Sequence, residues 1–227
     1  MIIETNGIQI ERLQESDIEL VRQWRNSAFV RQHMNYREHI TAEMQLKWFR
    51  SIDNFNNFYF ILRHKNLKVG LGDIKNVNWD DRSGEAGVFI AKKTYLSSFL
   101  PVVGALTLSE LVFRIFKLER IYSQIRADNK RAIKFNKLFG YKRVEGEESK
   151  NSQLHYLTAD SFFKATRKFF LLMKPLGFKT GNLVITLEAH DYQTDFGLQM
   201  EKLILDSGMN FKLEKKDGMT VFSEVSK

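Results

Sequence analysis

The sequence predicts a mixed α/β (α+β) fold, in which a twisted sheet is flanked by helices. Between residues 84 and 141 an apolar strand, a helix, a second strand and a second helix follow one another with short links, which is the order of an α/β unit. Residues 58–62 and 68–75 have the pattern of two strands joined as a hairpin. With 227 residues, of which 43% are apolar, the chain can bury a substantial core.

One strand and two helices are expected ahead of this hairpin. Residues 8–13 alternate between apolar and polar side chains and predict the first strand. Ser16 and Glu19 fit a capping box, so a helix is expected to begin there and to end near Asn26. A second helix, with several apolar side chains available for packing, is expected after Thr41.

The central unit begins with an apolar strand over residues 85–91. A polar connection leads to a helix from about residue 102 to residue 116, whose apolar residues recur at near-helical spacing. Residues 121–126 alternate and predict the next strand. A second helix begins at Asn129 and is closed by Gly140, as glycine often closes helices.

Two further short strands are expected to complete a first domain, which we place at residues 1–160. Residues 161–175 predict a connecting basic amphipathic helix, which could pack against the body or lie on a membrane surface. Residues 176–227 predict a small appendage with a β-α-β-β order and a hairpin at Asp217 and Gly218. We expect this appendage to dock on the main domain or to pair with another subunit, and its role cannot be derived from the sequence.

The composition excludes several classes of protein. The chain has no cysteine, which excludes disulfides, thiolate catalysis and cysteine-based zinc sites. The sequence has no apolar run long enough for a transmembrane segment and no secretory signal, so a cytoplasmic location is expected. The histidines show no metal-ligand spacing, so no metal is predicted. The net charge of +8 suits an anionic partner or reflects a lysine-rich surface, and without a basic stripe interleaved with aromatics, nucleic acid is not expected.

The central unit also carries a family resemblance. Glu85 precedes a glycine and an apolar strand, a long helix contains Phe113, and Asn129, Ala132 and Gly140 mark the next helix. In this order and spacing, the chain resembles the GNAT superfamily of N-acetyltransferases. The resemblance implies the GNAT fold with an antiparallel meander ahead of the central unit. It also implies an acyltransferase that takes acetyl-CoA as acyl donor between two splayed neighbouring strands.

The resemblance implies which residues contact acetyl-CoA. The start of the first central helix would hold the pyrophosphate, and Asn129 would mark the second coenzyme-contacting helix. The expected phosphate segment, residues 96–104, departs from the family because its one glycine is Gly104, whereas close approach of backbone N–H groups to phosphate favours residues without a Cβ. The residues expected at the coenzyme are Val88, Phe89, Ile90, Ala91, Leu96, Ser97, Ser98, Phe99, Val102, Val103, Asn129, Lys130, Arg131 and Phe135.

Glu85 and Asn136 are the candidate catalytic residues. Glu85 matches the family's strand glutamate, and beside apolar neighbours it could act as the base that deprotonates the amine, or it could be a pairing carboxylate. In many relatives a tyrosine at the position of Asn136 protonates the departing thiolate, whereas an amide can only hydrogen-bond the sulfur. Water, Tyr95 or Tyr141 is then the alternative proton source. Backbone N–H groups of the strand after Glu85 would face the thioester carbonyl.

The segment that follows the first strand is similar to the opening of GNAT enzymes that acetylate nucleotide-linked amino sugars for surface glycans, the PseH-like branch. This narrower resemblance implies that Arg25 and Arg31 meet acceptor phosphates, while Trp24 or Tyr36 flanks a ring. In the competing interpretation Trp24 belongs to the core and the two arginines lie on the surface. The candidate acceptor-binding residues are Trp24, Arg25, Asn26, Arg31 and Met34.

Other functions remain open at this point. The RimJ/RimL-like branch would acetylate a protein N-terminus, and a GNAT-like module could bind CoA without catalysis. The favoured expectation is transfer of an acetyl group to the amine of a small acceptor, with a nucleotide-linked amino sugar as the substrate. A homodimer is one option for the assembly.

Overall fold

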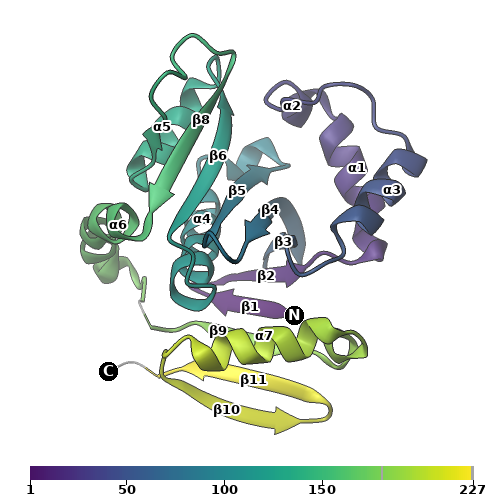
Figure 1. The fold of residues 1–227 in the computed structure, drawn as a ribbon, viewed down its shortest axis with the longest axis vertical. Coiled ribbons are helices and arrows are strands. Elements are labelled where there is room, and N and C mark those ends of the chain that lie inside the picture. Colours follow the sequence, from purple (N-terminus) through teal and green to yellow (C-terminus); the bar gives the residue numbers. More distant parts are fainter. Residues whose placement is uncertain (180, 226–227) are drawn as a thin grey trace.

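The structure, a computed structural model, describes residues 1–179 and 181–225. Within them a mixed sheet carries helices on both of its faces, as expected for the fold class (Figure 1). The strands are β1 (Ile2–Thr5), β2 (Ile8–Arg12), β3 (Phe58–His64), β4 (Leu67–Asn78), β5 (Ser83–Ile90), β6 (Arg120–Arg126), β7 (Lys142–Arg143), β8 (Ser152–Thr158), β9 (Val184–Leu187), β10 (Phe211–Lys216) and β11 (Met219–Glu224). The helices are α1 (Ile18–Asn26), α2 (Ala28–Arg31), α3 (Ala42–Ile52), α4 (Leu100–Glu110), α5 (Lys130–Leu138), α6 (Ala159–Met173) and α7 (Asp195–Asp206).

The strands lie in the order β10-β11-β9-β1-β2-β3-β4-β5-β6-β8-β7. Strands β2 to β5 are successive antiparallel neighbours, which confirms the meander that the family resemblance implied. The parallel step in the sheet is from β5 to β6, and α4 connects these two strands. In the part of the chain that the structure describes, no helix is long and apolar enough to cross a membrane.

The capping residues predicted for α1 are wrong. Gln14 and Asp17 form the capping box around a short 3-10 turn that precedes the helix. Gln14 has the extended backbone that a cap residue needs, with φ −114° and ψ 162°. The Glu19 carboxylate accepts instead from Arg22 Nε at 2.7 Å on the helix surface. The cap residue is therefore Gln14, two residues before the predicted Ser16.

The long helix of the central unit differs from the predicted 102–116 segment. It begins at Leu100. Pro101 lies in the first turn, where the N–H that proline lacks would not form a helical hydrogen bond, so the residue is compatible with this start. After Glu110 the chain continues as a π-helical turn, Leu111–Ile115, in which every residue except Arg114 is buried.

Two glycines let α4 approach the sheet closely. A Cβ at Gly104 would lie 2.6 Å from the Leu62 side chain, and a Cβ at Gly72 of β4 would lie 2.5 Å from the Leu108 side chain. Both distances are far shorter than a van der Waals contact, so a larger residue at either position would push the helix outward. Gly104 therefore serves the packing of α4 on the sheet.

Apolar side chains pack against both faces of the sheet. On one face, Phe60 and Ile74 belong to the large core that α4, α6 and α7 cover. On the other face, Ile61 and Leu71 belong to a smaller core under α1 and α3, to which Trp24 contributes. The alternation along β3 and β4 thus places successive residues under different helices.

The C-terminal appendage continues the main sheet. Its first strand, β9, pairs antiparallel with β1 on one side and with β11 on the other. Phe196, Met200 and Ile204 of α7 are part of the large core, and Figure 1 shows α7 lying along these strands. The expected β-α-β-β order is present, and the appendage docks on the main body, one of the two expected options. The sequence analysis did not predict that β1 is the strand it pairs with. The division into domains at residues 160 and 176 stays a prediction.

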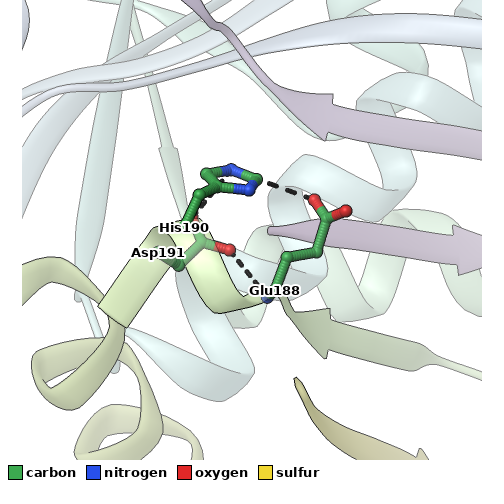
Figure 2. Close-up of side chains that lie close together, drawn as sticks. All are labelled: Glu188, His190 and Asp191. Carbon is green, nitrogen blue, oxygen red and sulfur yellow. Dashed lines mark hydrogen bonds and ion pairs between the residues drawn. The ribbon is translucent and has the colours of Figure 1, made fainter. Parts of the chain in front are cut away.

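A cluster of charged groups ties the appendage to the first two strands. Figure 2 shows Glu188, His190 and Asp191 close together, and the atoms that could bind a metal lie within 4.8 Å of one another. Asp191 is fully buried, accepts a hydrogen bond from the Met1 amino group and lies 3.4 Å from Arg12 Nη1. Because cations of the protein already neutralise Asp191, we interpret the cluster as a structural ion-pair network.

The substitution Asp191→Asn should lower the free energy of unfolding by about 2–4 kcal/mol, because it leaves the cations around this position without their buried partner. Urea unfolding measures the change. Asp53→Asn is the matched control: Asp53 accepts from the same Arg12 at 3.0 Å but is 55% exposed, and its loss should cost less than about 1 kcal/mol. Equal losses for the two variants would contradict this interpretation.

Candidate active site

Strands β5 and β6 separate after a short parallel contact. They pair only where residues 83–85 lie beside residues 120–122. Beyond this contact β5 stays paired with β4 as far as Ile90, and β6 stays paired with β8 as far as Arg126. Alternate backbone N–H and C=O groups of residues 86–90 therefore have no strand partner on the β6 side. This geometry agrees with the splayed strands that the family resemblance implied.

A cavity of about 480 Å³ opens between the diverging strands. On one face of the sheet its wall includes Arg25 from α1 and Phe29 from α2. On the opposite face its wall includes Leu108 from α4 and Phe135 from α5. The cavity thus passes through the sheet, so that two ligands entering from opposite faces could meet beside β5.

The cavity brings together part of the set expected at the coenzyme. The members that line its wall are Val88, Phe89, Ile90, Leu96, Asn129, Arg131 and Phe135. The members that lie outside the wall are Ala91, Ser97, Ser98, Phe99, Val102, Val103 and Lys130. Val103 is buried in the large core, whereas Ser97 and Lys130 are exposed. Strand β5 and the start of α5 therefore agree with the expectation better than the segment before α4.

The first turn of α4 offers few donors for a phosphate group. The N–H of Leu100 donates to Ser98 Oγ at 3.3 Å, Pro101 has no N–H, and the N–H of Val103 donates to the carbonyl at the helix start. Of the N–H groups at this helix start, whose residues are all described, those of Phe99 and Val102 have no acceptor. A helix N-terminus binds anions through several free N–H groups. This one is therefore a weak phosphate site.

The start of α5 supplies positive charge at the same end of the cavity. Asn129 caps the helix, with its side-chain oxygen accepting from the Ala132 N–H at 3.1 Å. Arg131 Nη2 donates to the carbonyl of Leu96 at 2.6 Å and so links α5 to the turn before α4. A carbonyl does not neutralise a guanidinium, so the charge of Arg131 is available to an anion beside these two helices.

The acceptor residues expected from the sequence separate into two groups. Arg25 and Met34 line the cavity, whereas Trp24, Asn26 and Arg31 do not. Trp24 is buried and meets the ring of Phe89 edge-on at 6.3 Å between centroids, so it packs in the core. Asn26 hydrogen-bonds both the N–H and the carbonyl of Ile40, which holds the loop after α2 in place.

Arg25 is a largely buried cation without a partner. Its Nε has no hydrogen-bond acceptor, and the described residues place no carboxylate within ion-pair distance of it. Burial lowers the pKa of Arg25 from its usual value, and the negative charge of Asp73 partly offsets this effect. Because an arginine stays charged in proteins and an unpaired buried charge is costly, this position suits a ligand that brings its own anion.

Both candidate catalytic residues line the cavity, but Glu85 lies in polar surroundings. Its carboxylate is 40% exposed, accepts from Asn76 Nδ2 at 2.9 Å and lies 4.0 Å from Lys75 Nζ. The apolar surroundings expected from the sequence are absent because Lys75 lies opposite Glu85 in the register of β4 with β5. Asn136 reaches the cavity from α5.

Tyr141 lines the cavity, and Tyr95, the other tyrosine considered as a proton donor, does not. Burial, together with the negative charge of Asp73, raises the pKa of Tyr141 above its usual value. A phenol with a raised pKa keeps its proton at neutral pH and can donate it. Of the two tyrosines, Tyr141 is therefore the one placed to supply a proton inside the cavity.

The sequence analysis missed Asp73 and Lys75 of β4. Both side chains lie on the cavity face, where Asp73 is opposite Gly87 and Lys75 is opposite Glu85. The signal was present in the sequence: two charged residues at alternate positions of an otherwise apolar strand must share one face. Their place at a site became clear only with the pairing of β4 and β5.

Comparison with known proteins adds a family and a fold. A family model described as an acetyltransferase (GNAT) domain matches residues 8–142. A chimera of the Vibrio cholerae spermidine N-acetyltransferase SpeG and hSSAT is similar in structure, with a TM-score of 0.61 and 16% identity over 70% of this chain and 99% of that one. A domain from Methanocaldococcus jannaschii has a TM-score of 0.57 and 19% identity, over 68% and 99%.

A third similar structure is the Vibrio cholerae spermidine N-acetyltransferase in complex with CoA and spermine, with a TM-score of 0.59 and 16% identity over 69% of this chain and 98% of that one. At these identities the solved structures show the fold alone. No curated protein matches the chain.

Arg25→Met should leave the free energy of unfolding unchanged or raise it by about 1–2 kcal/mol, because it replaces an unpaired buried charge by an apolar side chain of similar length. Arg22→Met on the same helix is the control, since it breaks the exposed pair with Glu19 and the hydrogen bond to the Ile40 carbonyl and should lower the free energy of unfolding. Urea unfolding compares the two variants. A larger loss for Arg25→Met than for Arg22→Met would show that Arg25 is already paired.

Proposed function

The chain belongs to the GNAT acetyltransferase family, and we propose that it transfers the acetyl group of acetyl-CoA to the amine of a small, phosphate-bearing acceptor such as a nucleotide-linked amino sugar. The observation that carries this proposal is the cavity between β5 and β6, which is open to helices on both faces of the sheet. Donor and acceptor would enter from opposite faces, with the donor on the α4 and α5 side. Alignment of two reactants in this way can supply much of a rate enhancement.

The cavity suits the thioester arm of acetyl-CoA better than its diphosphate. Acetyl-CoA supplies an acyl group that is activated as a thioester at the end of an amide-containing arm. The unpaired backbone groups of residues 86–90 can hydrogen-bond those amides and the thioester oxygen. The diphosphate would depend on Arg131 and the free N–H groups of Phe99 and Val102, because the start of α4 lacks further donors. We therefore expect modest, salt-sensitive affinity.

Tyr141 and Asn136 of the cavity would interact with the departing thiolate. Tyr141, like any phenol, keeps its proton at neutral pH, and it would protonate the departing sulfur. Asn136 would hydrogen-bond the sulfur without donating a full proton to it. Glu85 would help to hold the incoming ammonium group, since its carboxylate is partly exposed at the cavity wall.

Charge in the cavity favours an anionic acceptor over a polyamine. The wall contains the cations Arg25, Lys75, Arg126 and Arg131 and the acids Asp73 and Glu85. Arg126 is paired with Asp128, and Lys75 lies between the two acids, so these four cations and three acids leave a net charge of +1, near Arg25 and Arg131. A polycation such as the spermine bound by the Vibrio cholerae enzyme would meet an excess of positive charge here. A phosphate on the acceptor would pair with Arg25.

Acetyl-CoA titrated into the protein should bind in the cavity, as measured by calorimetry. Ala132→Trp places an indole in the cavity wall and should weaken binding at least about tenfold, because the ring fills the space between the strands. Lys134→Trp is the control, since Lys134 is exposed on the same helix and outside the cavity. Wild-type affinity in both variants would exclude the cavity as the donor site.

Release of CoA thiol with UDP-glucosamine, glucosamine, spermidine and a free peptide N-terminus tests the acceptor. Wild-type protein should prefer UDP-glucosamine. Arg25→Met should lower kcat/KM for UDP-glucosamine by about 10- to 100-fold, through loss of a charge-assisted hydrogen bond to phosphate, with a smaller effect on glucosamine. Preference of the wild type for spermidine or for the peptide would contradict the acceptor class and support the corresponding alternative.

A further inference from the structure

The cavity contains a carboxylate, Asp73, that is better shielded from water than Glu85. The Asp73 side chain is 15% exposed, against 40% for Glu85. Its Oδ2 is buried and forms an ion pair with the Lys75 ammonium group, which lies 3.6 Å away, beyond hydrogen-bond distance. Buried carboxylate oxygens normally accept from a closer donor. Asp73 therefore has only a long ion pair at Oδ2, on the cavity side of β4.

Gly87 keeps the space beside this carboxylate open. Asp73 and Gly87 are direct partners in the register of β4 with β5. A Cβ at position 87 would lie 3.2 Å from Asp73 Oδ1 and 3.4 Å from Oδ2, so any larger residue would crowd the carboxylate. Because Gly87 also lines the cavity, a small cationic group of a ligand can reach Asp73 beside the strand that would hold the thioester.

The surroundings of Asp73 favour its protonated form. Burial raises the pKa of Asp73 above its usual value, the charge of Glu85 raises it further, and the charges of Lys75 and Arg25 oppose these effects. A base works best when its pKa is near the working pH, so such a shift suits a proton acceptor. The titratable groups that face Asp73 from the elements around it are Lys75 on β4, Glu85 on β5, Arg25 on α1, Tyr59 on β3 and Tyr141 after α5.

We propose that Asp73 is the general base that removes a proton from the nitrogen of the acceptor, an inference that rests on the proposed acetyltransferase function. The nitrogen arrives as an ammonium group and ends as an amide, so it loses two protons. Asp73 takes the first and releases it to solvent. As the C–N bond forms and the C–S bond breaks with its electron pair left on sulfur, Tyr141 gives a proton to sulfur. The second nitrogen proton leaves to solvent, and Tyr141 is reprotonated from solvent.

Asp73→Asn removes the proton acceptor and nearly keeps the side-chain shape. With acetyl-CoA and UDP-glucosamine, kcat should fall about 100- to 1,000-fold. In the wild type kcat should rise with pH through the pKa of Asp73, and this dependence should be absent from the variant. Asp80→Asn, an exposed carboxylate in the turn before β5, is the control and should retain the wild-type rate and pH profile. A variant Asp73→Asn with an unchanged pH profile would overturn the proposal.

A weakly basic acceptor separates base catalysis from a structural role. Hydroxylamine is neutral at pH 7, so its nitrogen needs no deprotonation before it attacks. Asp73→Asn should therefore acetylate hydroxylamine at a rate much closer to the wild-type rate than it does UDP-glucosamine. Equal losses with both acceptors would mean that Asp73 only supports the structure, and would overturn the proposal.

A measurement on the unmodified protein does not depend on the folding of a variant. Carboxyl-carbon NMR titration should give Asp73 a pKa above that of ordinary aspartates, and a value at or below the ordinary range would overturn the assignment. Failure of the proposed function has a different signature, because the wild type itself would then acetylate none of the amines.

Discussion

The loss of pairing between β5 and β6 is the constraint on which the rest of the site depends. β5 stays paired with β4, and β6 stays paired with β8. The sheet therefore continues on both sides of a gap that opens between β5 and β6. Unpaired backbone groups at such a gap need hydrogen bonds from a ligand or from water. An extended molecule with amide groups of its own satisfies this need, which links the irregularity of the sheet to recognition of the donor.

The charged side chains around the gap have opposite signs on different elements. The α1 side carries Arg25, a cation without an ion pair, and β4 carries Asp73, whose ion pair with Lys75 is long at 3.6 Å. Neither group is fully compensated within the protein, although buried charges usually are. An acceptor with a phosphate and an amine would compensate both at once, and the distance between its two groups would then decide which molecules are acetylated.

Local patterns in the sequence predicted much of the fold but only part of the site. Asn129 and Gly140 bound α5 as expected, because a side-chain cap and a glycine with φ 95° are local features. The pairing of β1 with β9 joins distant segments and leaves no local pattern, so the junction of the appendage could not be predicted. Asp73 was missed for the same reason, since its position beside Gly87 follows from strand register. The phosphate segment was expected to be poor, and Ser98 and Pro101 account for it in atomic terms.

The position of β9 has a consequence for the behaviour of the isolated N-terminal part. Without β9, β1 would become an edge strand with its backbone groups exposed, and the apolar surface that α7 covers would face water. Bare edges of this kind recruit strands from other molecules and lead to aggregation. The appendage therefore covers a strand edge and an apolar surface that would both be exposed without it.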